Sequence, residues 1–147
     1  MSTMQAPTNI IDGAKNPQLI SDLTAYRLYF VLASRAANPS NKNNAHQKAY
    51  FSHAGLKAED TDVAAAILER FRTQYADLID RYNKEVERAS ITGNFPDQQE
   101  FLKKRDALVL STKTALEQQL SPESAASLAA HIQREKVFMK VSKGDGQ

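Results

Sequence analysis

Hydrophobic residues recur at three- and four-residue spacing along most of the chain, as in helices that bury one face. The longest such pattern extends from about Glu59 to about Ala89. Its apolar positions are Ile67, Phe71, Tyr75, Leu78, Tyr82, Val86 and Ala89. This heptad-like spacing favours near-parallel packing against a neighbouring helix. The pattern therefore predicts one long helix, roughly 45 Å in length at 1.5 Å per residue.

Two shorter helices are predicted before the long one. Asn16-Pro17 predicts the start of a first helix, because asparagine is a good cap and proline fits the first helical position. Its inward positions are Leu19, Leu23, Tyr26, Phe30, Ala33 and Ala37. The asparagine-rich segment 38–44 is a loop by composition. A short helix over Ala45–His53 follows and is closed by Ala54-Gly55.

Two more helices are predicted after the long one. The segment Ser90–Pro96 breaks the long helix, and Asp97 followed by Glu100 is typical of a capping box. The helix that starts there runs to about Gln119. Ser121-Pro122 then starts the final helix, with serine as the cap and proline at the first position.

The two ends of the chain lack sustained periodicity. Residues 1–15 are interpreted as a flexible N-terminal arm, with Ile10 and Ile11 as a docking point. Residues 142–147 are expected to fray. No segment combines strand alternation with hairpin turn residues. The sequence therefore predicts an all-α protein, an up-down helical bundle of four to five helices over residues 16–141.

Length and charge narrow the class of protein. The chain has 147 residues, which fits one domain, and 41% of them are hydrophobic. The net charge of +2 is spread along the chain, whereas a nucleic-acid binder usually carries a basic face or run. Tyr75 and Tyr82 lie near arginines, but aromatic residues at helical spacing are interpreted as core. We therefore expect no specific binding of nucleic acid. No apolar run approaches the length of a membrane span.

Metal and cofactor sites are not expected. The chain has no cysteine, which excludes disulfides and thiolate ligands but does not fix the cellular compartment. Its three histidines are His46, His53 and His131. Their spacing does not match that of a zinc helix. The acids Glu59, Asp60 and Asp62 do not supply a calcium loop and are interpreted as favouring the positive end of the long helix.

Signatures of enzymes are also missing from the sequence. There is no glycine-rich phosphate loop, no nucleophile elbow and no paired-histidine metal helix. Carboxylate pairs occur on the predicted helices, but nothing selects one pair as catalytic. The sequence therefore predicts a protein that is not an enzyme.

A candidate partner site lies beside the loop 38–44. Tyr29 in the first helix and Tyr50 and Phe51 in the short helix are predicted to line a partially exposed groove for a peptide or a second subunit. Loops placed on a rigid scaffold are common binding sites. The alternative interpretation is that these rings simply seal the end of the bundle.

The last third of the chain resembles a known family. The segment from Phe101-Leu102-Lys103-Lys104-Arg105 through Leu120-Ser121-Pro122-Glu123-Ser124 to Leu128 and Ile132 resembles small periplasmic helical proteins of the Spy type. Their leucine-threonine-proline-glutamate-glutamine signature lies between two helices. Here Ser121 replaces the threonine and Ser124 replaces the glutamine. The whole layout also resembles small secreted helical proteins of unknown function from soil bacteria.

These resemblances imply export, a helical bundle and no assigned activity. We therefore predict a periplasmic or secreted bundle that binds a protein or peptide partner or a second copy of itself. The start Met1-Ser2-Thr3-Met4 raises the hypothesis that a removed leader was replaced. The alternatives are a small-molecule or metal sensor domain and a cytoplasmic protein of a phage or nucleic-acid system.

Overall fold

The computed structural model describes residues 10–35 and 45–142, and 81% of these residues are helical. The prediction of an all-α helical bundle is confirmed. Residues 1–9 of the predicted arm, the predicted loop 38–44 and residues 143–147 of the predicted tail lie outside the described residues.

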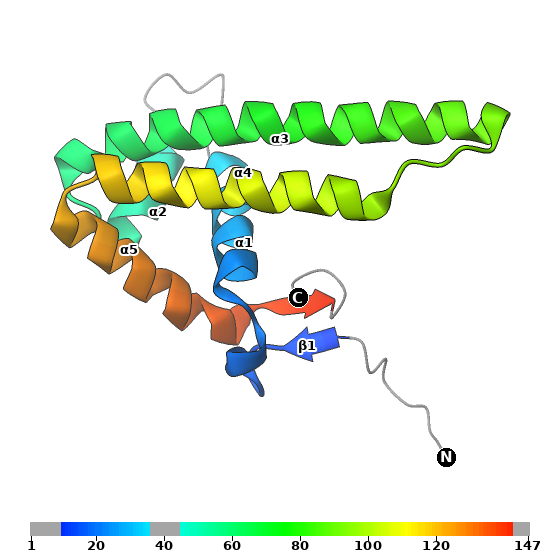
Figure 1. Cartoon of the computed structure of the whole chain (residues 1–147). Helices are drawn as coiled ribbons and strands as arrows, with labels where there is room; N and C mark the ends of the chain where they lie inside the picture. Colours follow the sequence, from blue (N-terminus) through cyan, green and yellow to red (C-terminus); the bar gives the residue numbers. More distant parts are fainter. Residues whose placement is uncertain (1–9, 36–44, 143–147) are drawn as a thin grey trace, which may run out of the picture.

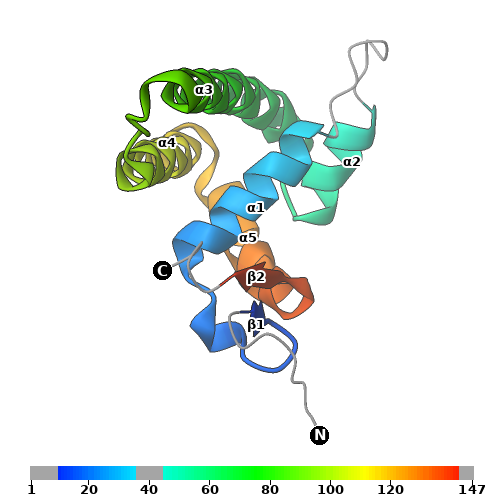
Figure 2. The same cartoon turned by 90° about the vertical axis from the view of Figure 1, so that its right-hand side faces the viewer.

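Two long helices form the main body of the fold (Figure 1). The α-helices are α1 (Asp22–Arg35), α2 (Ala45–His53), α3 (Ala58–Thr92), α4 (Gln98–Gln119) and α5 (Pro122–Glu135). α3 and α4 lie side by side as an antiparallel pair, and α1 crosses this pair while α5 leads away from its end. Figure 2, viewed along the pair, shows α1 against the pair and α2 beside α1 and α3.

The turn between α3 and α4 follows the predicted signals. α3 is closed by Gly93, whose positive φ of 81° suits glycine and whose N–H donates to the Ala89 carbonyl at 2.7 Å. The Asp97 carboxylate accepts from the Gln99 N–H at 2.9 Å and caps α4. The predicted long helix and Asp97 as the cap of α4 are therefore confirmed, although the Asp97 carboxylate accepts from the Gln99 N–H and not from the Glu100 N–H that a capping box uses.

The predicted start of the first helix is wrong by several residues. Pro17 begins only a single 3-10 turn, η1 (Pro17–Leu19), after which Ile20 is extended and buried. The helix proper, α1, begins at Asp22, next to Ser21, whose hydroxyl accepts from the Thr24 N–H at 3.1 Å. Burial of Ile20 therefore interrupts the helix that Asn16-Pro17 predicted, and Leu19 is exposed.

The start of α1 is also tied to the end of α5. The Asp22 carboxylate accepts from Lys136 Nζ at 2.7 Å and from Gln133 Nε2 at 2.6 Å. The bond from Lys136, followed by that from Gln133, lowers the pKa of Asp22. An acid in the first turn also suits the positive end of the helix. These contacts join elements that are far apart in sequence.

The ends of the described chain pair with each other, which the sequence did not predict. β1 (Ile10–Asp12) and β2 (Lys140–Ser142) form an antiparallel two-stranded sheet in which Ile11 opposes Val141. Ile11 and Val141 are both buried in the core. Next to β1, a Cβ on Gly13 would lie 1.7 Å from the carbonyl oxygen of Lys136, in the 3-10 turn η2 (Lys136–Phe138), so only glycine fits there. The expectation of a flexible arm up to residue 15 is therefore wrong for residues 10–15.

The core lies where α1 crosses the α3–α4 pair. Phe30 of α1 meets Phe71 of α3 edge-on, with ring centroids 5.4 Å apart, and both rings are almost fully buried. α2 is held by Gln47, whose buried amide donates to the Ala33 carbonyl in the last turn of α1 at 3.0 Å. Phe51 of α2 is, like Phe30 and Phe71, among the largest fully buried side chains. The core is therefore concentrated at one end of the long pair.

Candidate interaction surface

The groove predicted from Tyr29, Tyr50 and Phe51 is absent in that form. Tyr29 is 2% exposed and Phe51 is 1% exposed, so both rings belong to the core. Tyr50 is half-buried and packs on Tyr29, with ring centroids 5.0 Å apart. The prediction that these residues line a partially exposed groove is therefore wrong, because the rings seal the contact between α1 and α2.

The Tyr29 ring lies in an aromatic cluster between α1, α2 and α5. Its edge also meets His131 of α5 at a centroid distance of 5.8 Å, and His131 in turn lies 5.6 Å from His53. The Tyr29 hydroxyl is buried without a hydrogen-bond partner. Burial raises the pKa of this hydroxyl, with smaller effects from Tyr50 and Glu135. The cluster therefore keeps a neutral tyrosine in an apolar environment.

The histidines are not assembled into a metal centre. His53 and His131 lie together, and His46 is exposed at the start of α2. Within residues 10–35 and 45–142, no group of three or more histidine, aspartate or glutamate side chains is placed to hold a metal ion. Burial lowers the pKa of His131, which favours its neutral form.

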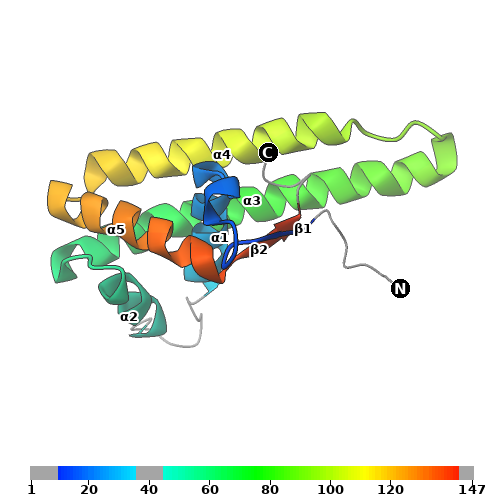
Figure 3. The ribbon, with the colours of Figure 1, turned by 90° about the horizontal axis from the view of Figure 1, so that it is seen from below.

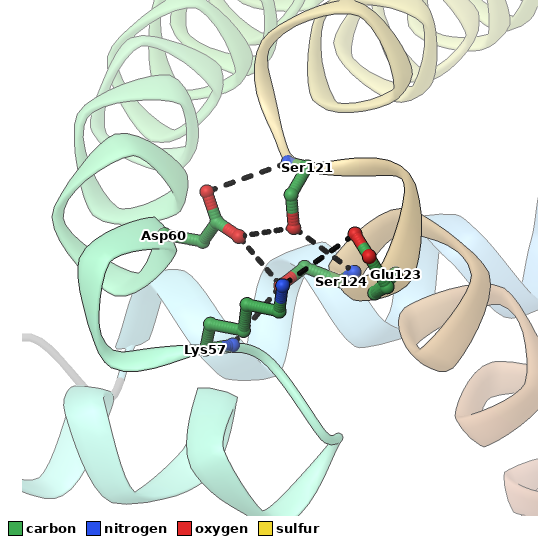
Figure 4. A network of polar contacts seen from close by, with 5 residues as sticks. All are labelled: Lys57, Asp60, Ser121, Glu123 and Ser124. Carbon is green, nitrogen blue, oxygen red and sulfur yellow. Dashed lines mark hydrogen bonds and ion pairs between the residues drawn. The ribbon is translucent and has the colours of Figure 1, made fainter.

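A buried polar network joins the start of α3 to the start of α5 (Figure 4). The Asp60 carboxylate accepts from the hydroxyls of Ser124 and Ser121, at 2.6 Å and 2.7 Å. The Lys57 backbone N–H donates to the Ser124 hydroxyl at 3.0 Å. Lys57 Nζ lies 3.5 Å from the Glu123 carboxylate. The network clamps together two helix starts that are far apart in sequence.

The network explains how Asp60 can be buried. Hydrogen bonds from Ser124 and then Ser121 lower the pKa of Asp60, so the carboxylate stays charged. It also lies in the first turn of α3 and beside the first turn of α5, and both helix starts favour a negative charge. The interpretation that Asp60 sits at the positive end of the long helix agrees with this position, but the sequence did not predict its serine partners. We call this network the Asp60 joint, because it holds the starts of α3 and α5 together.

Among the helices that the structure describes, none besides α3 and α4 lies along the outer part of the α3–α4 pair (Figure 1 and Figure 3). We call residues 74–108 the distal arm. In Figure 3 the distal arm projects past the other elements. α3 is described over its whole length, and its buried residues stop at Phe71 except for Ala89. Four large apolar side chains of the distal arm on α3 are only half-buried: Tyr75, Leu78, Tyr82 and Val86.

A groove of about 530 Å³ runs between the two helices of the distal arm. Its apolar lining consists of Leu78, Tyr82, Phe101 and Leu108, and the rings of Tyr82 and Phe101 are 4.8 Å apart. A second hollow of about 210 Å³ lies nearer the core and includes Ile67, Phe71 and Ala115. Gln74 lines both hollows. We call the first of these hollows the arm groove.

The charges of the arm groove are unbalanced. It is lined by four carboxylates and two cations: Asp77, Glu85, Asp97 and Glu100 with Arg81 and Lys104. Arg81 is already paired with Asp77 at 3.0 Å. The arm groove therefore carries a net negative charge around an apolar floor.

The lengths of the helices point to this surface, whereas hydrophobic periodicity alone does not. The apolar face of the long helix from Ile67 to Ala89, which we call its seam, predicts contact with neighbouring helices. Its aromatic residues Tyr75 and Tyr82 are interpreted from the sequence as core. The shorter helices α1 and α2, with 14 and 9 residues, cannot cover the whole of α3, with 35 residues. The mismatch in length therefore indicates an uncovered stretch of seam.

Comparison with models of known protein families, with curated proteins and with solved structures finds no match to this chain. The resemblance to Spy-type proteins stays a prediction. Among the helices that the structure describes, none combines the length and the apolar character needed to cross a membrane.

Proposed function

We propose that this chain is a non-enzymatic binding protein that holds a protein or peptide partner in the arm groove. The observation that carries the proposal is the apolar seam between α3 and α4 that no other described helix covers (Figure 1 and Figure 3). Leu78, Tyr82 and Phe101 are only half-buried there, whereas the same helix pair is well covered at Phe71. A seam of this kind is stabilised when another apolar surface excludes water from it.

The geometry of the arm groove suits a macromolecular partner. Two helices in near-parallel contact leave a lengthwise channel, and a third helix can lay its apolar side chains into that channel. The compact end of the fold, with its core around Phe30 and Phe71 and its Asp60 joint, supplies a rigid base. The distal arm then presents its surface without rearrangement of the core.

Photo-crosslinking tests the proposal. Gln74 lines the arm groove, while Asn83 is an exposed amide on the same helix that does not line it. We would replace each in turn with p-benzoylphenylalanine and irradiate cells of the native host. The expected result is an adduct of discrete mass from position 74 and none from position 83. Equal adducts from both positions, or none from position 74, would contradict the proposal.

Export is a second part of the proposal. It is supported by the resemblance to periplasmic helical proteins and is compatible with the lack of cysteine. Expression of the gene with its native upstream codons, followed by cell fractionation, tests it. Recovery of the chain only with cytoplasmic markers would overturn export and leave the arm-groove proposal in place.

A further inference from the structure

The lining of the arm groove has the same length on both helices. Gln74 and Glu85 on α3 are eleven residues apart, as are Asp97, the cap of α4, and Leu108 on α4. At 1.5 Å per residue the arm groove is therefore about 17 Å long. That length matches about three turns of one helix.

The arm groove and the hollow nearer the core offer different surfaces. In the hollow nearer the core, Ile67 and Phe71 are 3% and 1% exposed and leave little apolar surface for an occupant. In the arm groove, Glu85, Asp97 and Glu100 remain after Arg81 has paired with Asp77, and they outnumber Lys104. An occupant of the arm groove therefore meets an apolar floor and a negative rim together.

We propose, building on the proposed function, that the occupant is an amphipathic helix of at least three turns with lysine or arginine beside its apolar stripe. Its apolar side chains would cover Leu78, Tyr82 and Phe101. Its cations would face Glu85 and Glu100. Opposite charges across an interface fix its register and speed association, while the apolar stripe supplies the larger part of the affinity.

The charge pattern argues against a second copy as the occupant. Pairing two arm grooves would bring Glu85, Asp97 and Glu100 of one copy close to the same residues of the other. Like charges brought together across an interface oppose association. A partner whose cations line the contact has no such cost. Self-association is therefore an outcome of the test that counts against this inference.

The test uses two designed peptides of eighteen residues, which is long enough for a helix of three turns, with the same leucine stripe. One carries lysine beside the stripe, and the other carries glutamate at those positions. Binding to the full chain is measured by fluorescence anisotropy. We expect the lysine peptide to bind at least about tenfold more tightly, a difference of about 1.4 kcal/mol. Added salt should weaken its binding, because salt screens exposed charges.

Two double variants with the same net charge separate a site from general attraction. Glu85→Lys with Glu100→Lys changes the arm groove, whereas Glu87→Lys with Glu117→Lys changes exposed positions on the same two helices outside it. The first pair should weaken lysine-peptide binding about tenfold and strengthen glutamate-peptide binding. The control pair should leave both within about twofold. Circular dichroism checks that each variant is helical.

Several results would overturn the inference. They are equal affinity for both peptides, equal weakening by both double variants, no binding of either peptide, or a dimer formed through the arm groove in analytical ultracentrifugation. The photo-crosslink at position 74 distinguishes failure of this inference from failure of the proposed function. An adduct to another protein combined with no preference for the lysine peptide would retain the proposed function and reject the basic helix as its partner.

Discussion

The α3–α4 pair has two ends with the same helical pattern and different surroundings. Near the core, Phe71 is 1% exposed and touches Phe30 and Tyr75. In the distal arm, Tyr82 occupies a corresponding seam position but is only half-buried and packs on Phe101. The contrast increases toward the turn, where Ile91 is 87% exposed and Phe95 is 67% exposed.

The difference shows that periodicity defines a face but does not say what covers it. α1, α2 and α5 gather at one end of the pair, so burial there comes from several helices at once. Among the described residues of the distal arm, Tyr75 and Leu108 pack against the core cluster, whereas Tyr82 and Phe101 pack on each other. Since stabilisation follows the apolar area removed from water, the near end should dominate folding stability and the distal arm should be free to bind.

The largest expected change in the free energy of unfolding distinguishes the two ends of the pair. Phe71→Ala should lower the free energy of unfolding by about 3–5 kcal/mol, because a fully buried ring is replaced by a cavity. Tyr82→Ala should cost less than half as much, because its ring is already partly in water. Urea denaturation followed by circular dichroism measures both. Equal losses would mean that the distal arm is as important for folding as the core.

The next effect concerns the aromatic cluster around His131. Burial lowers the pKa of His131, so the unfolded chain takes up a proton at higher pH than the folded chain. Stability should therefore be fully present above about pH 6.5 and fall as the pH drops below that value. The neighbouring groups that bear on it are Glu135, His53 and Arg134.

Urea titrations between pH 8 and pH 5.5 check this slope. His131→Phe should reduce it, because phenylalanine keeps a ring without a titrating nitrogen. His46→Gln is the matched control, since His46 is exposed on α2, and should leave the slope unchanged. An unaltered slope in His131→Phe would assign the pH dependence to other groups.

The smallest expected effect lies at the far end of the distal arm. Ile91→Ser and Phe95→Ser remove side chains that are mostly in solvent, so the free energy of unfolding should change by no more than about 0.5 kcal/mol. Thermal unfolding of each variant tests this value. A loss above about 1 kcal/mol at either position would show that the turn packs more tightly than its exposure indicates.

The sequence by itself determined most of the helices. Glycine at position 93 and the caps Asp97 and Ser121 act through neighbouring backbone groups, and the seam of α3 repeats a local period. Such signals need no distant partner, which is why the long helix and the starts of α4 and α5 follow from the sequence. The same period also identifies the residues of the candidate surface, but it assigns them to a core.

Tertiary structure alone decided the remaining features. The start of α1 depends on burial of Ile20, and β1 depends on a three-residue strand from the other end of the chain. The serine partners of Asp60 lie 61 and 64 residues away along the chain. The arm groove exists because the shorter helices gather at one end of a longer pair. Contacts between distant segments leave no periodic trace in either segment, so only the folded chain shows which apolar faces are covered.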